Sequence, residues 1–177
     1  TTEADQFYEP KDLSQFPYKF SLDDSGGMIV TIGSQKFFVS SAFSLRGGGW
    51  LRLDSNRDAS RNLTIRHVSG TRKELILKNH DFTLTRTINL FPNHIAVHDE
   101  FVNHLNTIIG IKIRNRIISP DQSCQGWIGG NYPPPIELNE TERTFVHVIQ
   151  DNALLGLVAR DDVYRSQAIC YGKENEV

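Results

Sequence analysis

The stretch Phe82–Asn103, with the sequence FTLTRTINLFPNHIAVHDEFVN, decides the fold of this chain. Apolar and polar residues alternate over residues 82–90, as they do in a β-strand with one buried face. Pro92-Asn93 marks a turn, and alternation resumes over residues 95–101. The stretch therefore predicts an antiparallel β-hairpin.

The alternation also predicts the register of this hairpin. Pairing that is symmetric about Pro92-Asn93 brings apolar side chains together: Leu90 with Ile95, Ile88 with Val97, and Leu84 with Phe101. The same register places Arg86 opposite Asp99 on the apolar face, where a lone charge would cost several kcal/mol. Two interpretations remain open: an ion pair that fixes the register, or a groove in which both residues contact a polar ligand.

Strand-like alternation continues on both sides of the hairpin, and no window shows the spacing of an amphipathic helix. Turn residues separate the strand patterns at short intervals, which is typical of a sandwich. We therefore expect an all-β, antiparallel β-sandwich with little helix. The expected strands cover residues 18–22, 28–32, 37–45, 50–53, 63–68, 75–77, 109–116, 144–149 and 154–159.

The strand expected at 109–116 follows a turn at Asn103–Asn106, and we expect it to lie beside the second strand of the hairpin. Its basic residues Lys112, Arg114 and Arg116 alternate with isoleucines, which favours a solvated outer face rather than a phosphate site. His98 and Glu100 of the hairpin would then lie on the same outer face.

Composition indicates a globular chain of 177 residues, with 38% hydrophobic residues and a net charge of −2. We expect an irregular lead-in at 1–17, one β-sandwich domain at 18–170 and a polar tail at 171–177. The chain, which lacks an initial methionine, is interpreted as a processed protein or a piece of a longer one. No basic cluster, membrane segment or signal peptide is recognised, so we expect a soluble chain without nucleic-acid or membrane partners; its compartment stays open.

Motifs for catalysis or cofactors are not found in this sequence. The six histidines form no metal-binding pattern, and Cys124 and Cys170 lack zinc-site spacing, while their bonding state stays open. Asp99 and Glu100 are adjacent, so on a strand they point to opposite faces and cannot straddle a glycosidic bond. We expect no metal, no cofactor and, for this chain by itself, no enzymatic activity.

Exposed aromatic residues carry the remaining ligand signal. The stretch Gly126–Pro135 is rich in glycine and proline and contains Trp127 and Tyr132, so it predicts a loop whose rings stack on a sugar. Alternatively, Trp127 caps one end of the core. Trp50 begins a strand and is expected to enter the core.

Three segments together resemble a known family: residues 27–44, residues 84–103 and residues 155–162. The second carries the most telling pattern, R-x-I-x-L-x-P-x-x-I-x-V-x-D-x-x-x-N. The chain resembles the galactose-mutarotase-like β-supersandwich domains that accompany catalytic domains in glycoside hydrolases and polysaccharide lyases. In those domains the second segment is a structural strand pair, and no catalytic histidine or glutamate of a mutarotase is matched here.

The resemblance implies a non-catalytic module of a carbohydrate-active protein that serves as scaffold, domain interface or weak glycan binder. Its partners would be a glycan and an adjacent catalytic domain or subunit. Two alternatives stay open: a sugar-acting enzyme domain of the hydrolase or lyase type, and a structural assembly module without a ligand. The expected ligand contacts are Trp127, Tyr132, Arg86 and Asp99.

Overall fold

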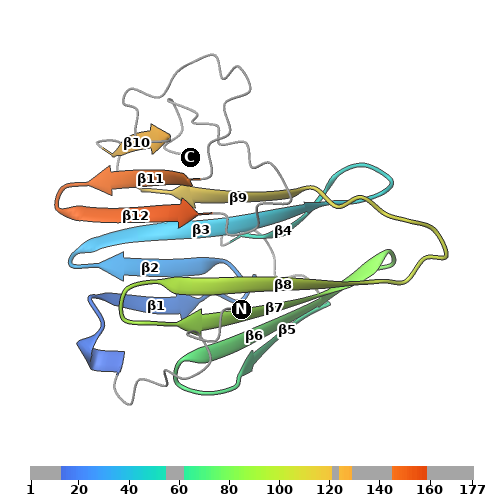
Figure 1. Cartoon of the computed structure of the whole chain (residues 1–177), viewed down its shortest axis with the longest axis horizontal. Helices are drawn as coiled ribbons and strands as arrows, with labels where there is room; N and C mark the ends of the chain where they lie inside the picture. The colour runs from blue at the N-terminus through green and yellow to red at the C-terminus, as the bar shows by residue number, and fades with distance from the viewer. Residues whose placement is uncertain (1–12, 55–61, 121–123, 129–144, 159–177) are drawn as a thin grey trace.

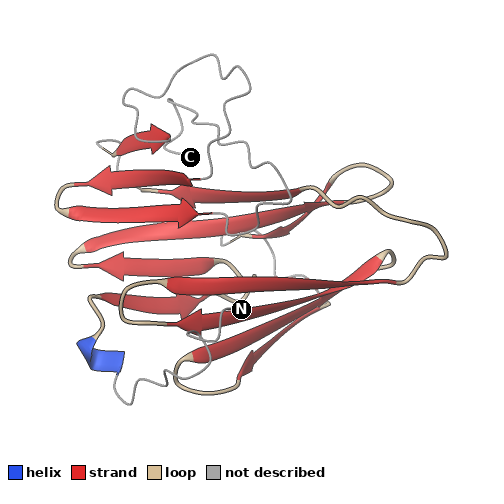
Figure 2. Ribbon diagram, in the orientation of Figure 1, coloured by secondary structure: helices blue, strands red, loops and turns tan. Residues whose placement is uncertain are grey.

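The computed structural model describes residues 13–54, 62–120, 124–128 and 145–158, and most of these residues are in β-strands (Figure 2). A single 3-10 turn, η2 (Leu13–Gln15), precedes the first strand within this part of the chain. The strands form three antiparallel sheets, A, B and C. The expected all-β fold with little helix is therefore confirmed.

Sheet A is built around the long strand β3. It contains β1 (Tyr18–Leu22), β2 (Met28–Ile32), β3 (Gln35–Ser44), β4 (Trp50–Leu53) and β9 (Ile113–Ile118). Ala42 pairs with Arg52 of β4 and with Arg114 of β9, so these two strands lie on opposite edges of β3. The turn between β1 and β2 requires a left-handed residue, which is Gly26 with φ of 78°.

Sheet B is a meander of four strands. It contains β5 (Leu63–His67), β6 (Arg72–Lys78), β7 (Phe82–Leu90) and β8 (Ile95–Asn103), in that order. Residues of β7 and β8 pair as the sequence predicts, from Leu90 with Ile95 to Leu84 with Phe101 and including Arg86 with Asp99. The predicted hairpin register is confirmed.

The strand after this hairpin departs from expectation. The segment that follows Asn103 leaves sheet B at one end of the molecule, and β9 then pairs with β3 of sheet A (Figure 1). The prediction that this strand lies beside β8 was wrong, because alternation fixes which residues share a face but not which strand is the neighbour. As a result, Arg114 and Arg116 lie beside β3 instead of beside His98 and Glu100.

Sheet C contains β10 (Gln125–Ile128), β11 (Phe145–Gln150) and β12 (Ala153–Val158). The last two strands form the expected hairpin, with Asp151 in a left-handed conformation at the turn. Gln150 of this hairpin is buried, accepts a hydrogen bond from Ser119 and donates one to Gln35. These bonds attach sheet C to sheet A.

The core lies between sheet A on one side and sheets B and C on the other. Phe37 and Phe43 of sheet A, Leu84 of sheet B and Val148 of sheet C belong to one continuous apolar cluster. All four side chains are fully buried, which explains why the inner positions of each strand alternate with polar ones. No helix in the described part of the chain is long and apolar enough to cross a membrane.

Candidate functional site

Arg86 and Asp99, both expected from the sequence to bind a ligand or each other, form a two-pronged ion pair inside the sandwich. Arg86 donates from Nε to Oδ1 and from Nη2 to Oδ2 of Asp99, both at 2.7 Å. The Arg86 side chain is 2% exposed and that of Asp99 is 14% exposed. Such parallel hydrogen bonds to a carboxylate are the strong geometry for a guanidinium group.

The third nitrogen of this guanidinium reaches across to sheet A. Nη1 of Arg86 donates to Oγ of Ser41 at 2.7 Å, and Ser41 in turn donates to Oδ1 of Asn115 at 2.7 Å. The guanidinium also lies 5.4 Å from the centre of the Phe43 ring. All three guanidinium nitrogens therefore contact groups of the chain itself. The ion pair lies within sheet B, and the hydrogen bond to Ser41 joins it to sheet A. A ligand contact by Arg86 or Asp99 stays a prediction.

Trp127 lies on strand β10 and not on the loop that the sequence predicted. Glycine on either side favoured a loop, but Trp127 pairs with His147 of β11, and His147 pairs with Gly156 of β12. Tyr132, the other aromatic residue of the predicted loop, lies outside the described residues.

Three aromatic rings form a row on the outer face of sheet C. The ring centres of Trp127 and His147 are 5.7 Å apart with planes 14° from parallel, and those of His147 and Phe145 are 6.2 Å apart at 7°. Fully overlapped rings would lie about 3.5–4 Å apart, so these rings are offset. Each therefore leaves part of its face uncovered by its neighbour in the row.

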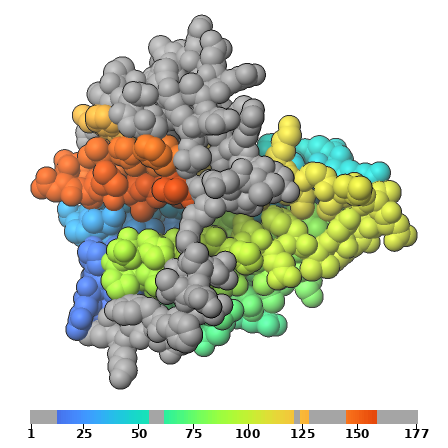
Figure 3. Space-filling view, viewed as in Figure 1, coloured from blue at the N-terminus to red at the C-terminus, as the bar shows by residue number. Residues whose placement is uncertain are grey.

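The surface around this row is apolar. Phe145, Leu154 and Val158 share the outer face and are 39%, 54% and 68% exposed, whereas Val148 on the inner face is fully buried. Figure 3 shows the β11–β12 hairpin at the surface of the molecule. Phe145 and His147 were not predicted as site residues, although their alternation with the half-buried Val146 and the buried Val148 marks them as one face of a strand. We call Trp127, His147, Phe145, Leu154 and Val158 the aromatic face.

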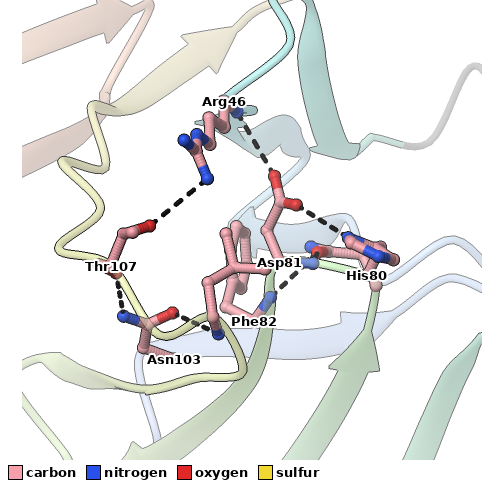
Figure 4. Close-up of polar contacts among 8 residues, drawn as sticks. Arg46, His80, Asp81, Phe82, Asn103 and Thr107 are labelled. Atoms are coloured by element: carbon pink, nitrogen blue, oxygen red, sulfur yellow. Dashed lines mark hydrogen bonds and ion pairs between the residues drawn. The ribbon is translucent and has the colours of Figure 1, made fainter.

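A second candidate lies at one end of the sandwich, where three connecting segments meet (Figure 4). Oδ2 of Asp81 accepts a hydrogen bond from the backbone of Arg46 at 3.3 Å, and Oδ1 lies 3.2 Å from Nδ1 of His80. The hydrogen bond with His80 lowers the pKa of Asp81 below its ordinary value. Nη1 of Arg46 donates to Oγ1 of Thr107 at 3.3 Å.

These contacts border a small cavity of about 100 Å³. It is lined by Ser44, Arg46, Asp81, Phe82 and the segment 108–111. Its polar groups already bond to one another, so the arrangement joins the β3–β4, β6–β7 and β8–β9 connections. A cavity of this size is far smaller than the roughly 300–1,000 Å³ of a typical ligand pocket.

Metal binding finds no support in the described part of the chain, where no group of three or more His, Cys, Asp or Glu side chains comes together. Cys124 is half-buried against the core, and Cys170 lies outside the described residues. Because Cys170 is not described, the structure does not test a bond between Cys124 and Cys170.

Comparison with family models, with curated proteins and with solved structures gives no significant match for this chain. The resemblance to galactose-mutarotase-like domains therefore stays a prediction that rests on the residues quoted for it. The fold and the geometry of the sites carry the functional argument.

Proposed function

We propose that this chain is a non-catalytic β-sandwich module of a carbohydrate-active protein and that it contacts a glycan through the aromatic face of sheet C. The observation that carries the proposal is the row of nearly parallel rings formed by Trp127, His147 and Phe145 on an exposed sheet face. The C–H faces of a sugar ring pack on aromatic surfaces, and a strand-based row holds its rings in place without a deep pocket.

The interior of the sandwich supports a non-catalytic role. The charged pair that faces inward, Arg86 with Asp99, is joined to Ser41 and holds sheets A and B together. Such a pair stabilises a scaffold, whereas a substrate-binding guanidinium keeps donors directed at its ligand. The chain would thus supply a rigid platform, and an adjacent catalytic domain or subunit would supply the chemistry.

A glycan-array screen followed by calorimetry of the whole chain tests the proposal. We expect weak binding of an oligosaccharide and no detectable binding of simple monosaccharides, because a row of rings spans more than one sugar unit. Trp127→Ala and Phe145→Ala should each weaken binding by about fivefold or more, the loss of roughly 1 kcal/mol of ring contact.

Phe38→Ala is the matched control, because Phe38 is a half-buried aromatic residue of β3 in sheet A, beneath the ammonium of Lys36. It should leave glycan affinity unchanged. If no glycan on the array binds, or if Phe38→Ala weakens binding as much as Trp127→Ala does, the proposed role of the aromatic face is wrong.

A further inference from the structure

The outer face of sheet A carries a cluster of arginines that the proposed function does not use. Ala42 of β3 has Arg52 on one side and Arg114 on the other as direct register partners. Arg116 pairs with Ser40 on the same face. With strands about 4.8 Å apart, the backbones of Arg52 and Arg114 lie about 10 Å apart, a distance that two long side chains can bridge.

The β3 side chains that lie between the two arginines are small. Ser40 and Ala42 share this face, and they form the floor of a shallow groove whose walls come from β4 and β9. Trp50, Arg52, Asp54, Arg114 and Arg116 also line this groove. We call it the Arg52–Arg114 groove; its side chains bring three positive charges and one negative charge together.

Trp50 holds one of these arginines in place. The prediction that Trp50 enters the core was wrong, because Trp50 pairs with Ser44 and lies half-buried on the outer face. The guanidinium of Arg114 lies 4.7 Å from the centre of its ring. Stacking fixes the plane of a guanidinium and leaves the N–H groups on its edge available for an acceptor.

The guanidinium of Arg52 also has N–H groups available for an acceptor. Its side chain is half-buried, and no hydrogen bond or ion pair joins its guanidinium to another residue in the described part of the chain. A partly desolvated guanidinium gains from a charged acceptor more than a fully solvated one does. Arg114 thus reaches across β3 to Trp50 on β4, the strand that also carries Arg52, and the groove presents two planar donor groups.

We propose that the Arg52–Arg114 groove binds an oxyanion of the phosphate or sulfate type. Both groups present several acceptor oxygens to the paired N–H donors of guanidinium, which suits recognition by two arginines better than the two oxygens of one carboxylate. The oxyanion is either a free ion or an ester group on a larger molecule. Sheets A and C turn their outer faces in opposite directions, so this site does not depend on the aromatic face.

Calorimetry of the whole chain at low ionic strength tests the site with four probes: inorganic phosphate, inorganic sulfate, glucose 6-phosphate and acetate. We expect phosphate and sulfate to bind and acetate to bind at least about tenfold more weakly. Equal binding of inorganic phosphate and glucose 6-phosphate would assign the site to the oxyanion itself, whereas tighter binding of the ester would assign it to a phosphorylated molecule.

Variants then locate the site. Arg52→Gln and Arg114→Gln should each weaken phosphate binding about tenfold, because each removes a charge-assisted pair of donors. Arg114→Lys should recover only part of the affinity, since an ammonium cannot form the planar stack on Trp50. Thermal melts should show all three variants folded, because these side chains lie outside the core.

Arg72→Gln is the matched control, an exposed arginine on β6 of sheet B. It should leave phosphate binding unchanged, as should Trp127→Ala. The proposal is overturned if neither phosphate nor sulfate binds, or if Arg72→Gln weakens binding as much as Arg52→Gln does. The latter result would indicate attraction to net positive charge without a site.

Discussion

The inner face of the β7–β8 hairpin and the outer face of sheet C reverse the usual placement of polar and apolar side chains. The first buries the charged Arg86, which is 1% exposed, whereas the second exposes Phe145, Leu154 and Val158. The buried charge has its donors matched by Asp99 and Ser41. The exposed apolar side chains extend instead from a sheet whose opposite face already packs on the core.

This difference shows that a charged residue in the interior and an apolar residue at the surface have separate explanations. A buried charge with matched hydrogen bonds belongs to the architecture, since the loss of any partner would leave a desolvated group behind. An exposed apolar face contributes little to the stability of the fold and is available for contacts with other molecules. Stability measurements should therefore respond strongly to changes in the first region and weakly to changes in the second.

The largest effect should come from breaking the buried ion pair. Arg86→Leu or Asp99→Leu alone should lower the free energy of unfolding by about 3–5 kcal/mol, because each leaves the other charge buried without its partner. The double replacement should cost less than the two single losses combined. A double-mutant cycle in urea measures this coupling. Simple additivity would show that the charges do not interact and that the comparison with the aromatic face is misplaced.

Two leucines give a matched test of the inner and outer faces. Leu84 of β7 is fully buried and Leu154 of β12 is 54% exposed. Leu84→Ala should destabilise the fold by about 2–5 kcal/mol, whereas Leu154→Ala should change stability by about 0.5 kcal/mol or less. Chemical denaturation measures both. A large loss for Leu154→Ala would mean that the aromatic face is part of the packed structure.

The link between sheets A and B can be tested separately. Ser41→Ala removes the hydroxyl that accepts from Arg86 and donates to Asn115. We expect a loss of about 1.5–3 kcal/mol, since a hydrogen bond to a charged group is broken in the interior. Ser21→Ala on the exposed side of β1 serves as control and should fall within about 0.5 kcal/mol of the parent. Equal melting temperatures for the two variants would contradict the bridging role.

The smallest effect concerns alkaline pH. Burial raises the pKa of Tyr18 from 10.0 to about 12, and its hydroxyl donates to the backbone oxygen of Phe91 at 2.6 Å. The unfolded chain ionises this phenol first, so stability should fall as the pH rises from 10 towards 12. Solvent screening of the half-exposed ring limits the loss to about 1 kcal/mol. Tyr18→Phe, measured by denaturation across this range, should show a flatter pH dependence; an unchanged slope would rule out Tyr18.

The sequence predicted the β7–β8 hairpin in full, because a short turn and strict alternation leave a single register that pairs apolar with apolar residues. The same alternation identified the strand that contains Arg114 but not its neighbour. Pairing of β9 with β3 depends on the path of a connecting segment, which carries no periodic pattern. For that reason Trp50 and Arg114, which come together only through this pairing, were assigned separate and different roles.

The candidate site was predictable to a smaller extent. Trp127 was predicted to contact a ligand, but its neighbours His147 and Phe145 lie on a strand about twenty residues later in the chain. Glycines beside Trp127 indicated a loop, whereas cross-strand pairing with β11 outweighs the weak strand propensity of glycine. A search for aromatic residues at alternate positions of other strands would have found Phe145 and His147.

The pairing of β9 with β3 also leads us to expect a particular order of folding. Strands β1 to β4 and β5 to β8 are each joined by successive hairpins, which form within microseconds when they are stable. Strands β3 and β9 are separated in the chain by the whole β5–β8 meander. The entropy of closing this long loop therefore opposes early formation of the β3–β9 pair. The ion pair of Arg86 with Asp99 is local and precedes this step, whereas the contact of Arg86 with Ser41 follows from docking of the two meanders. We therefore expect closure by β9 to be the slow event that completes sheet A.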